Sequence, residues 1–144
     1  MSKLSNIHKR AWTAANKAQK LAYAPYSNYK VGASLVSGSK IFSGCNVENA
    51  SYGATICAER GAVLKAVSSG VKSFNSLIVV TKAGAAPCAL CLQVLSEFCG
   101  PELEIWIATP KKILGQVKLS QLLGFPFRKS DLKRGVKTAF HLRA

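Results

Sequence analysis

Four side chains in the middle of the chain have the types and the spacing for hydrolytic metal chemistry. Cys57 is followed two residues later by Glu59, and Pro87 directly precedes the pair Cys88 and Cys91. Three thiolates can hold a zinc ion with one position left open, and such an ion lowers the pKa of bound water to roughly 7. A carboxylate this close can take up the proton of that water and pass it on as a general acid. The pattern predicts a catalytic zinc centre.

The pair Cys88 and Cys91 could instead be half of a structural zinc site, or it could be a redox pair. A structural zinc ion needs four protein ligands, whereas Cys45 and Cys99 are expected to pack as small apolar side chains. The combination of the pair with Glu59 favours the catalytic centre. Because three thiolates carry more negative charge than zinc offsets, Arg60 is expected to donate hydrogen bonds to a ligand sulfur; the alternative is a surface arginine.

Alternating helices and strands must position these side chains. Helical spacing of apolar residues predicts an amphipathic helix over 5–23, ended by the segment at Pro25. Two strands joined by a Ser-Gly-Ser turn, 30–36 and 40–46, predict a hairpin. The further expected elements are helices at 57–69, closed by Gly70, and 88–98, buried strands at 76–82 and 103–109, an edge strand at 113–119, and helical turns at 118–123 and 130–136.

This order of elements indicates a layered α/β fold in which the first two strands of the sheet form an antiparallel hairpin. The helix over 88–98 lies between two buried strands and has the length of a crossover connection. Cys57 and Cys88 fall at the starts of two helices. Helix N-termini favour anions, so both positions suit thiolates.

Composition limits the class of protein. The chain has 144 residues, and 49% of them are apolar, which suits a single domain over 1–144 with a hydrophobic core. It contains no apolar run of about 20 residues that could span a bilayer. The charged N-terminus lacks the apolar stretch of a secretory signal, so a cytoplasmic location and no membrane partner are expected. In that reducing compartment clustered cysteines favour metal binding over disulfides.

The net charge of +14 is concentrated in basic N- and C-terminal flanks. Residues 1–40 carry +7, residues 41–110 carry −1 and residues 111–144 carry +8. Such flanks attract polyanions, so salt-sensitive binding of nucleic acid is one expectation. A basic exterior that is merely solvated explains the composition equally well.

The sequence resembles the small homotetrameric zinc-dependent cytidine deaminases from about residue 7 to 132. The stretches that carry the resemblance are AYAPYSNYKVGASLV, GCNVENASYGATICAERGAVLKAV, PCALCLQVLSEF and LLGFPF. Their Cys-x-Glu and Pro-Cys-x-x-Cys motifs match the known signature of zinc deaminases. The resemblance implies a three-layer α/β/α fold with a five-stranded mixed sheet, and a tetramer whose active sites borrow residues from neighbouring chains. It also implies the zinc ligands Cys57, Cys88 and Cys91 and the proton shuttle Glu59.

The same resemblance implies a set of substrate-binding residues. Asn46 and Glu48 match the pair that holds the ribose 3′-hydroxyl, and an amide with a carboxylate can both donate to and accept from a sugar diol. The backbone of Ala58 matches a contact to the base. Tyr29 stands where the family usually has Phe beside the pyrimidine, and Phe127 matches an aromatic that reaches the base from a neighbouring subunit. From composition alone, core packing explains these two aromatic residues equally well.

Three positions depart from the family pattern. Ala89 replaces the usual Gly and Leu92 the usual Arg, which removes a positive charge from the helix beside the metal. Gly124 stands where the family has Pro, and Phe125 and Pro126 come directly after it. The loop that carries Phe127 is therefore expected to take a different course.

The leading functional hypothesis is an enzyme of pyrimidine salvage that deaminates cytidine, deoxycytidine or both to the uracil nucleosides. Its nucleophile would be a zinc-bound hydroxide, with Glu59 as the proton shuttle. One alternative is a deaminase acting on cytosine in single-stranded nucleic acid or in another cytosine-containing compound, such as an antibiotic. A second is a non-catalytic zinc protein that binds nucleic acid or a nucleoside. The Asn46–Glu48 pair argues against a polymer because it suits a free 3′-hydroxyl, and Glu59 argues against a purely structural site.

Overall fold

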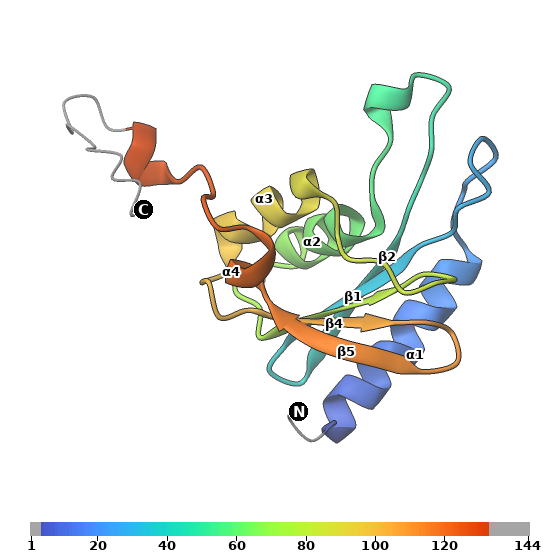
Figure 1. The fold of residues 1–144 in the computed structure, drawn as a ribbon, viewed down its shortest axis with the longest axis horizontal. Helices are drawn as coiled ribbons and strands as arrows, with labels where there is room; N and C mark the ends of the chain where they lie inside the picture. Colours follow the sequence, from blue (N-terminus) through green and yellow to red (C-terminus); the bar gives the residue numbers. More distant parts are fainter. Residues whose placement is uncertain (1–3, 133–144) are drawn as a thin grey trace.

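Five strands form one mixed sheet at the centre of the structure, a computed structural model that describes residues 4–132 (Figure 1). The strands are β1 (Gly32–Ser37), β2 (Lys40–Cys45), β3 (Ser76–Val80), β4 (Glu104–Ala108) and β5 (Ile113–Lys118). Their order across the sheet is β2-β1-β3-β4-β5. Only β3 and β4 run parallel among these neighbours, and the other three pairs are antiparallel. The predicted hairpin, crossover and edge strand are confirmed.

Helices cover both faces of this sheet. The helices of the described residues are α1 (Asn6–Lys20), η1 (Tyr52–Ala54), α2 (Ala58–Ser68), α3 (Ala89–Phe98), α4 (Leu119–Leu122) and η2 (Lys129–Leu132), of which η1 and η2 project away from the sheet (Figure 1). The helix α1 lies on one face and α2 with α3 on the other, which confirms the predicted three layers (Figure 1). The predicted turn over 130–136 begins within η2 and otherwise lies outside the described residues. Between residues 4 and 132 no helix has the length and hydropathy to cross a membrane.

Alternating side chains of β3 separate two hydrophobic cores. Leu77 and Val79 pack in the core beneath α2 and α3, whereas Ile78 and Val80 pack in the core beneath α1. Every residue of β3 is buried, which explains why its sequence is a continuous apolar run rather than an alternating one. The first of these cores holds α2 and α3, which begin at the cysteine motifs, against one side of the sheet.

Close contact between β2 and α2 depends on Gly44. A Cβ atom at this position would lie 2.5 Å from the backbone nitrogen of Ala62 and 2.6 Å from the carbonyl oxygen of Ala58. The helix therefore rests on the backbone of the strand itself, with no side chain between them. This contact fixes the first turn of α2, where the candidate ligand Cys57 and Glu59 lie.

Candidate active site

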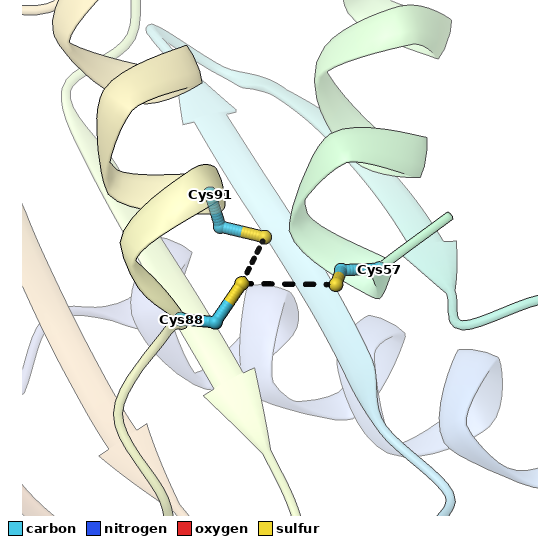
Figure 2. Close-up of side chains that lie close together, drawn as sticks. All are labelled: Cys57, Cys88 and Cys91. Atoms are coloured by element: carbon cyan, nitrogen blue, oxygen red, sulfur yellow. Dashed lines mark hydrogen bonds between the residues drawn. The ribbon is translucent and has the colours of Figure 1, made fainter. Parts of the chain in front are cut away.

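The three cysteines of the sequence motifs come together at the starts of two helices (Figure 2). Cys57 is the N-cap residue of α2, Cys88 is the N-cap residue of α3, and Cys91 lies in the first turn of α3. All three sulfur atoms lie within 4.8 Å of one another. Among residues 4–132 this is the one cluster of His, Cys, Asp or Glu side chains with metal-binding geometry.

The spacing of the sulfur atoms fits a zinc ion. Zinc–sulfur bonds of about 2.3 Å in tetrahedral geometry put sulfur atoms about 3.8 Å apart. The Sγ atoms of Cys57 and Cys88 are 3.9 Å apart, and those of Cys88 and Cys91 are 3.5 Å apart. Because the cluster offers three ligands within the described residues, it matches a catalytic zinc site with an open position rather than a closed structural site.

Arg60 contributes positive charge beside this cluster. Its Nη2 atom lies 3.5 Å from the Sγ atom of Cys57 and donates a 3.0 Å hydrogen bond to the carbonyl oxygen of Thr55. Cys91 first and then Arg60 lower the pKa of the Cys57 thiol to about 5. The pKa of Cys91 is raised, because its thiol donates to that of Cys57 and because it is buried. The hydrogen bond from Arg60 thus favours the thiolate form of Cys57.

Glu59 occupies the buried side of the cluster. Its side chain is only 5% exposed, and its Oε2 atom lies 3.5 Å from the Sγ atom of Cys91. Burial, with the nearby charge of Cys57 as a smaller contribution, raises the pKa of this carboxyl group. A carboxyl group whose pKa is raised toward neutrality can both accept and donate a proton, as a general acid–base catalyst must.

A cavity of about 310 Å³ opens onto the cluster. This volume is at the lower end of the range for ligand pockets. Cys57, Glu59 and Cys88 line its floor. The other lining residues include four of the five positions predicted to bind substrate: Tyr29, Asn46, Glu48 and Ala58. Tyr29 is 46% exposed, which excludes the alternative that it packs in the core.

Asn46 holds the wall of this cavity together. Its Oδ1 atom accepts a 2.8 Å hydrogen bond from the backbone nitrogen of Val31, and its Nδ2 atom donates a 2.8 Å hydrogen bond to the carbonyl oxygen of Tyr29. An amide side chain can make about four hydrogen bonds, so one donor and one acceptor position remain for a ligand.

Glu48 binds the neighbouring loop in the same way. Its carboxylate accepts hydrogen bonds from the backbone nitrogen atoms of Tyr26 (2.9 Å) and Ser27 (3.2 Å) and from the Ser27 hydroxyl. The Ser27 hydroxyl is the main cause of a lowered pKa of Glu48. The carboxylate has about four acceptor positions, so it retains capacity for one more donor.

Thr81 also lines the cavity and was not among the predicted site residues. Its buried hydroxyl accepts 2.8 Å hydrogen bonds from the backbone nitrogen atoms of Gly84 and Ala85. These bonds turn the chain after β3 toward Pro87 and Cys88. A threonine directly after a buried strand is the one signal in the sequence that could have indicated this role.

Phe127 lies outside the cavity of its own chain. Its side chain is 59% exposed, so it does not pack in the core either. In Figure 1 the segment after α4 extends away from the sheet and its helices. The side-chain amide of Gln93, on α3, makes two hydrogen bonds to the backbone of Phe127. Gln93 was not predicted as a site residue.

The two remaining cysteines lie apart from the cluster. Cys99 packs against the core beneath α2 and α3, where burial raises the pKa of its thiol to about 12. Cys45 is half-buried at the end of β2. Neither belongs to the group of side chains that can hold a metal ion, so among the described residues neither supplies a fourth ligand.

Known proteins share both the sequence and the fold of this chain. The family model of the cytidine and deoxycytidylate deaminase zinc-binding region matches residues 5–106. A cytidine deaminase of Sporosarcina psychrophila is 42% identical over 121 residues, which cover 82% of this chain and 89% of that protein. A probable cytidine deaminase of Dictyostelium discoideum is 41% identical over 123 residues, covering 83% and 82%.

Solved structures give the same result. The crystal structure of a cytidine deaminase from Burkholderia pseudomallei, 42% identical, superposes with a TM-score of 0.79 and covers 83% of this chain and 98% of that one. That of a cytidine deaminase from Mycobacterium tuberculosis is 36% identical, with a TM-score of 0.72 and coverage of 83% and 96%.

Proposed function

The chain belongs to the family of cytidine and deoxycytidylate deaminases, and on this premise we propose that it deaminates free cytidine, deoxycytidine or both in pyrimidine salvage. The reaction replaces the exocyclic amine of the base with an oxygen from water and releases ammonia. The observation that carries the proposal is the cluster of three thiols beside Glu59, onto which the cavity lined by Cys57, Glu59 and Cys88 opens, because it combines a zinc-binding donor set with a buried proton carrier.

The residues of the cluster fit the zinc ion of this family. Cys57, Cys88 and Cys91 would hold it from the starts of two helices, where the helix dipoles favour thiolates. Zinc bound there supplies Lewis acidity, which makes water a strong nucleophile near neutral pH. Arg60 donates to the Cys57 sulfur and offsets part of the negative charge of three thiolates.

Glu59 moves the protons of the reaction. Its carboxylate accepts a proton from the attacking water and delivers it to the ring nitrogen of the base, and a second transfer goes to the leaving amine. Because the side chain is buried, bulk water does not compete for the proton between these transfers.

The lining of the cavity supports an assignment of the nucleoside to its walls. Asn46 and Glu48 would bind the ribose 3′-hydroxyl with the hydrogen-bonding positions that the loop over 26–31 leaves free. Tyr29 would lie beside the pyrimidine ring, and the backbone of Ala58 would contact its polar edge. A 3′-phosphodiester would meet the negative charge of Glu48, which favours a free nucleoside over a polymer.

A homotetramer is part of the same proposal. The Phe127 ring is exposed on a segment that extends from the body of the chain, so it is available to a second copy but not to its own cavity. In such an assembly each active site is complete only when a neighbouring chain supplies its aromatic ring. Light scattering should then give a mass near four times the 15.4 kDa of one chain. A fully active monomer would contradict this part of the proposal.

The test of the substrate is an ultraviolet assay of the purified protein with cytidine, deoxycytidine, dCMP and a cytosine-bearing single-stranded oligonucleotide. Turnover of a free nucleoside with little conversion of internal cytosines is the expected result. Efficient formation of uracil within the oligonucleotide, with cytidine left unchanged, would instead identify the enzyme as a nucleic-acid deaminase.

One observation favours a second, non-catalytic property, the binding of nucleic acid. Four basic side chains of α1 lie within about 100° of its circumference, since each residue turns the helix by 100°. They are the exposed residues Lys9, Arg10, Lys17 and Lys20, called here the basic stripe. Between residues 4 and 132 none of them forms an ion pair, and the first acidic residue of the chain is Glu48.

The basic stripe lies on the other side of the sheet from α2 and α3, so a polymer bound there does not enter the cavity. Its test is binding of a labelled single-stranded oligonucleotide at increasing salt. Three or four phosphate contacts predict a slope of about −2 to −3 for log K against log salt concentration. Changing Lys9, Arg10 and Lys17 to Gln should remove most of this slope. The same change at three other exposed lysines, Lys65, Lys72 and Lys82, should not.

A further inference from the structure

Gln93 binds the backbone of Phe127 through both ends of its side-chain amide. The Nε2 atom donates a 2.7 Å hydrogen bond to the carbonyl oxygen of Phe127, and the Oε1 atom accepts a 3.0 Å hydrogen bond from its backbone nitrogen. We propose that Gln93 is a positioning residue, which fixes the Phe127 backbone on α3 so that the exposed aromatic ring is presented to the substrate cavity of a second copy of the chain. This inference rests on the proposed function.

The course of the chain shows why such a contact matters. Leu122 and Leu123 still pack against the core, but a Cβ atom at Gly124 would find no other atom within 4 Å. The chain thus leaves the body at a residue without a side chain and in open space. Three residues later it is bound by the amide of Gln93, and at Arg128 the backbone nitrogen donates to Asp131 at the start of η2.

The two hydrogen bonds fix orientation as well as distance. A single bond would allow the peptide to swivel about it, whereas a donor and an acceptor on one planar amide hold the peptide at two points. The ring of Phe127 receives no comparable support, because its side chain is more than half exposed. The direction in which the ring projects therefore depends on its backbone, and so on Gln93.

The position of Gln93 ties this segment to the metal centre. It lies two residues after Cys91 on α3, whose first turn also begins at Cys88. A rigid helix therefore carries two candidate zinc ligands of its own site and, through Gln93, the aromatic ring intended for a neighbour's site. The replacement of the usual family Pro by Gly124 makes this support more important, since Gly restricts the backbone least.

The first experiment measures the contact without any reference to activity. Hydrogen exchange of the segment over 124–132 is compared between the wild type, Gln93→Leu and Glu97→Leu. Glu97 is the control because it is exposed on the same helix and its side chain has no hydrogen bond or ion pair within residues 4–132. Faster exchange at the Phe127 amide in Gln93→Leu alone supports the proposal. Equal exchange in all three proteins refutes it.

The second experiment asks whether Gln93 acts through Phe127. Loss of an aromatic contact corresponds to roughly a three- to tenfold effect on binding. Both Phe127→Ala and Gln93→Leu should therefore raise KM for cytidine within that range, with a smaller change in kcat. Because the two changes disrupt one contact, the double variant should have the KM of Phe127→Ala alone. Glu97→Leu should retain the KM of the wild type.

The failures of the two proposals are distinguishable. If the effects of Gln93→Leu and Phe127→Ala on KM multiply, Gln93 acts independently of Phe127 and the inference is wrong. A wild-type protein without activity toward either cytidine or deoxycytidine would overturn the proposed function and the substrate-binding part of this inference. The exchange experiment would then still decide whether Gln93 holds the segment.

Discussion

Replacing Gly44 by Ala should damage both the stability and the metal centre of this protein. The new methyl group would lie 2.5 Å from the backbone nitrogen of Ala62 and 2.6 Å from the carbonyl oxygen of Ala58. Backbone atoms cannot rotate away as the end of a long side chain can, so α2 must move off β2 by about 1 Å to reach an ordinary contact near 3.5 Å.

The size of the effect follows from the cost of overpacking. An added methylene in a well-packed region costs about 1–3 kcal/mol. For a chain close to 150 residues each kcal/mol lowers the melting temperature by about 2–4 °C, so Gly44→Ala should melt about 2–12 °C lower. Since α2 begins at Cys57 and carries Glu59, the same movement should lower zinc content and activity.

Gly61 provides a matched control on the same helix. A Cβ atom there would lie 3.5 Å from the carbonyl oxygen of Cys45, which is an ordinary contact. Alanine is also favoured over glycine inside a helix by about 1 kcal/mol, so Gly61→Ala should melt at the same temperature or slightly higher.

Thermal unfolding and metal analysis of the two variants form the assay. If the Gly44→Ala protein has the same melting temperature as Gly61→Ala and keeps its zinc, the argument that α2 rests directly on β2 is refuted.

Three further predictions concern single side chains. Cys88→Ala should lose the tightly bound zinc, about one equivalent per chain by metal analysis, whereas Cys99→Ser should keep it. Because burial raises the pKa of Cys99 to about 12, iodoacetamide at pH 8 should leave this thiol unmodified until the protein unfolds; labelling in the folded state would contradict this. Glu48 has a pKa below its ordinary value of 4.5 in the folded chain, so it stabilises the fold above that pH and loses this effect as the pH falls through the lowered pKa. Glu48→Gln should therefore weaken the dependence of melting temperature on pH below about 5, and unchanged curves would contradict the hydrogen bonds to its carboxylate.

The elements of the fold could be predicted because their signals are local. Pro25 follows the end of α1, and Gly70, with a φ of +81°, lies just beyond α2. The continuous apolar run of β3 indicated a strand buried on both faces. The short helix η1 had no such signal, since its three residues Tyr-Gly-Ala have no periodicity and none of them is buried.

The site was predictable to the extent that side-chain types define it. The three thiols and Glu59 carry chemistry that their spacing alone indicates, and the structure brings them together. Asn46 was expected to face substrate, but the sequence could not show that its amide also binds the backbone at Tyr29 and Val31.

Contacts to distant backbone atoms leave no trace in the sequence. The groups of Phe127 that Gln93 binds are a backbone carbonyl and a backbone N–H, which almost every residue has. Gln93 also lies 34 positions away in the sequence. The hydrogen bonds between Gln93 and Phe127 can be identified only when the positions of α3 and of the segment after α4 in space are known.

The most direct test of the central claim is the activity of Glu59→Gln beside its zinc content. The amide keeps the shape of the carboxylate but cannot carry a proton. General acid–base catalysis alone contributes about 10²–10⁴-fold, and one residue here serves several transfers. We expect unchanged zinc, an unchanged fold and a loss of cytidine turnover at or beyond the upper end of this range. Turnover within tenfold of the wild type, with zinc still bound, would contradict the assignment of Glu59 as the proton carrier.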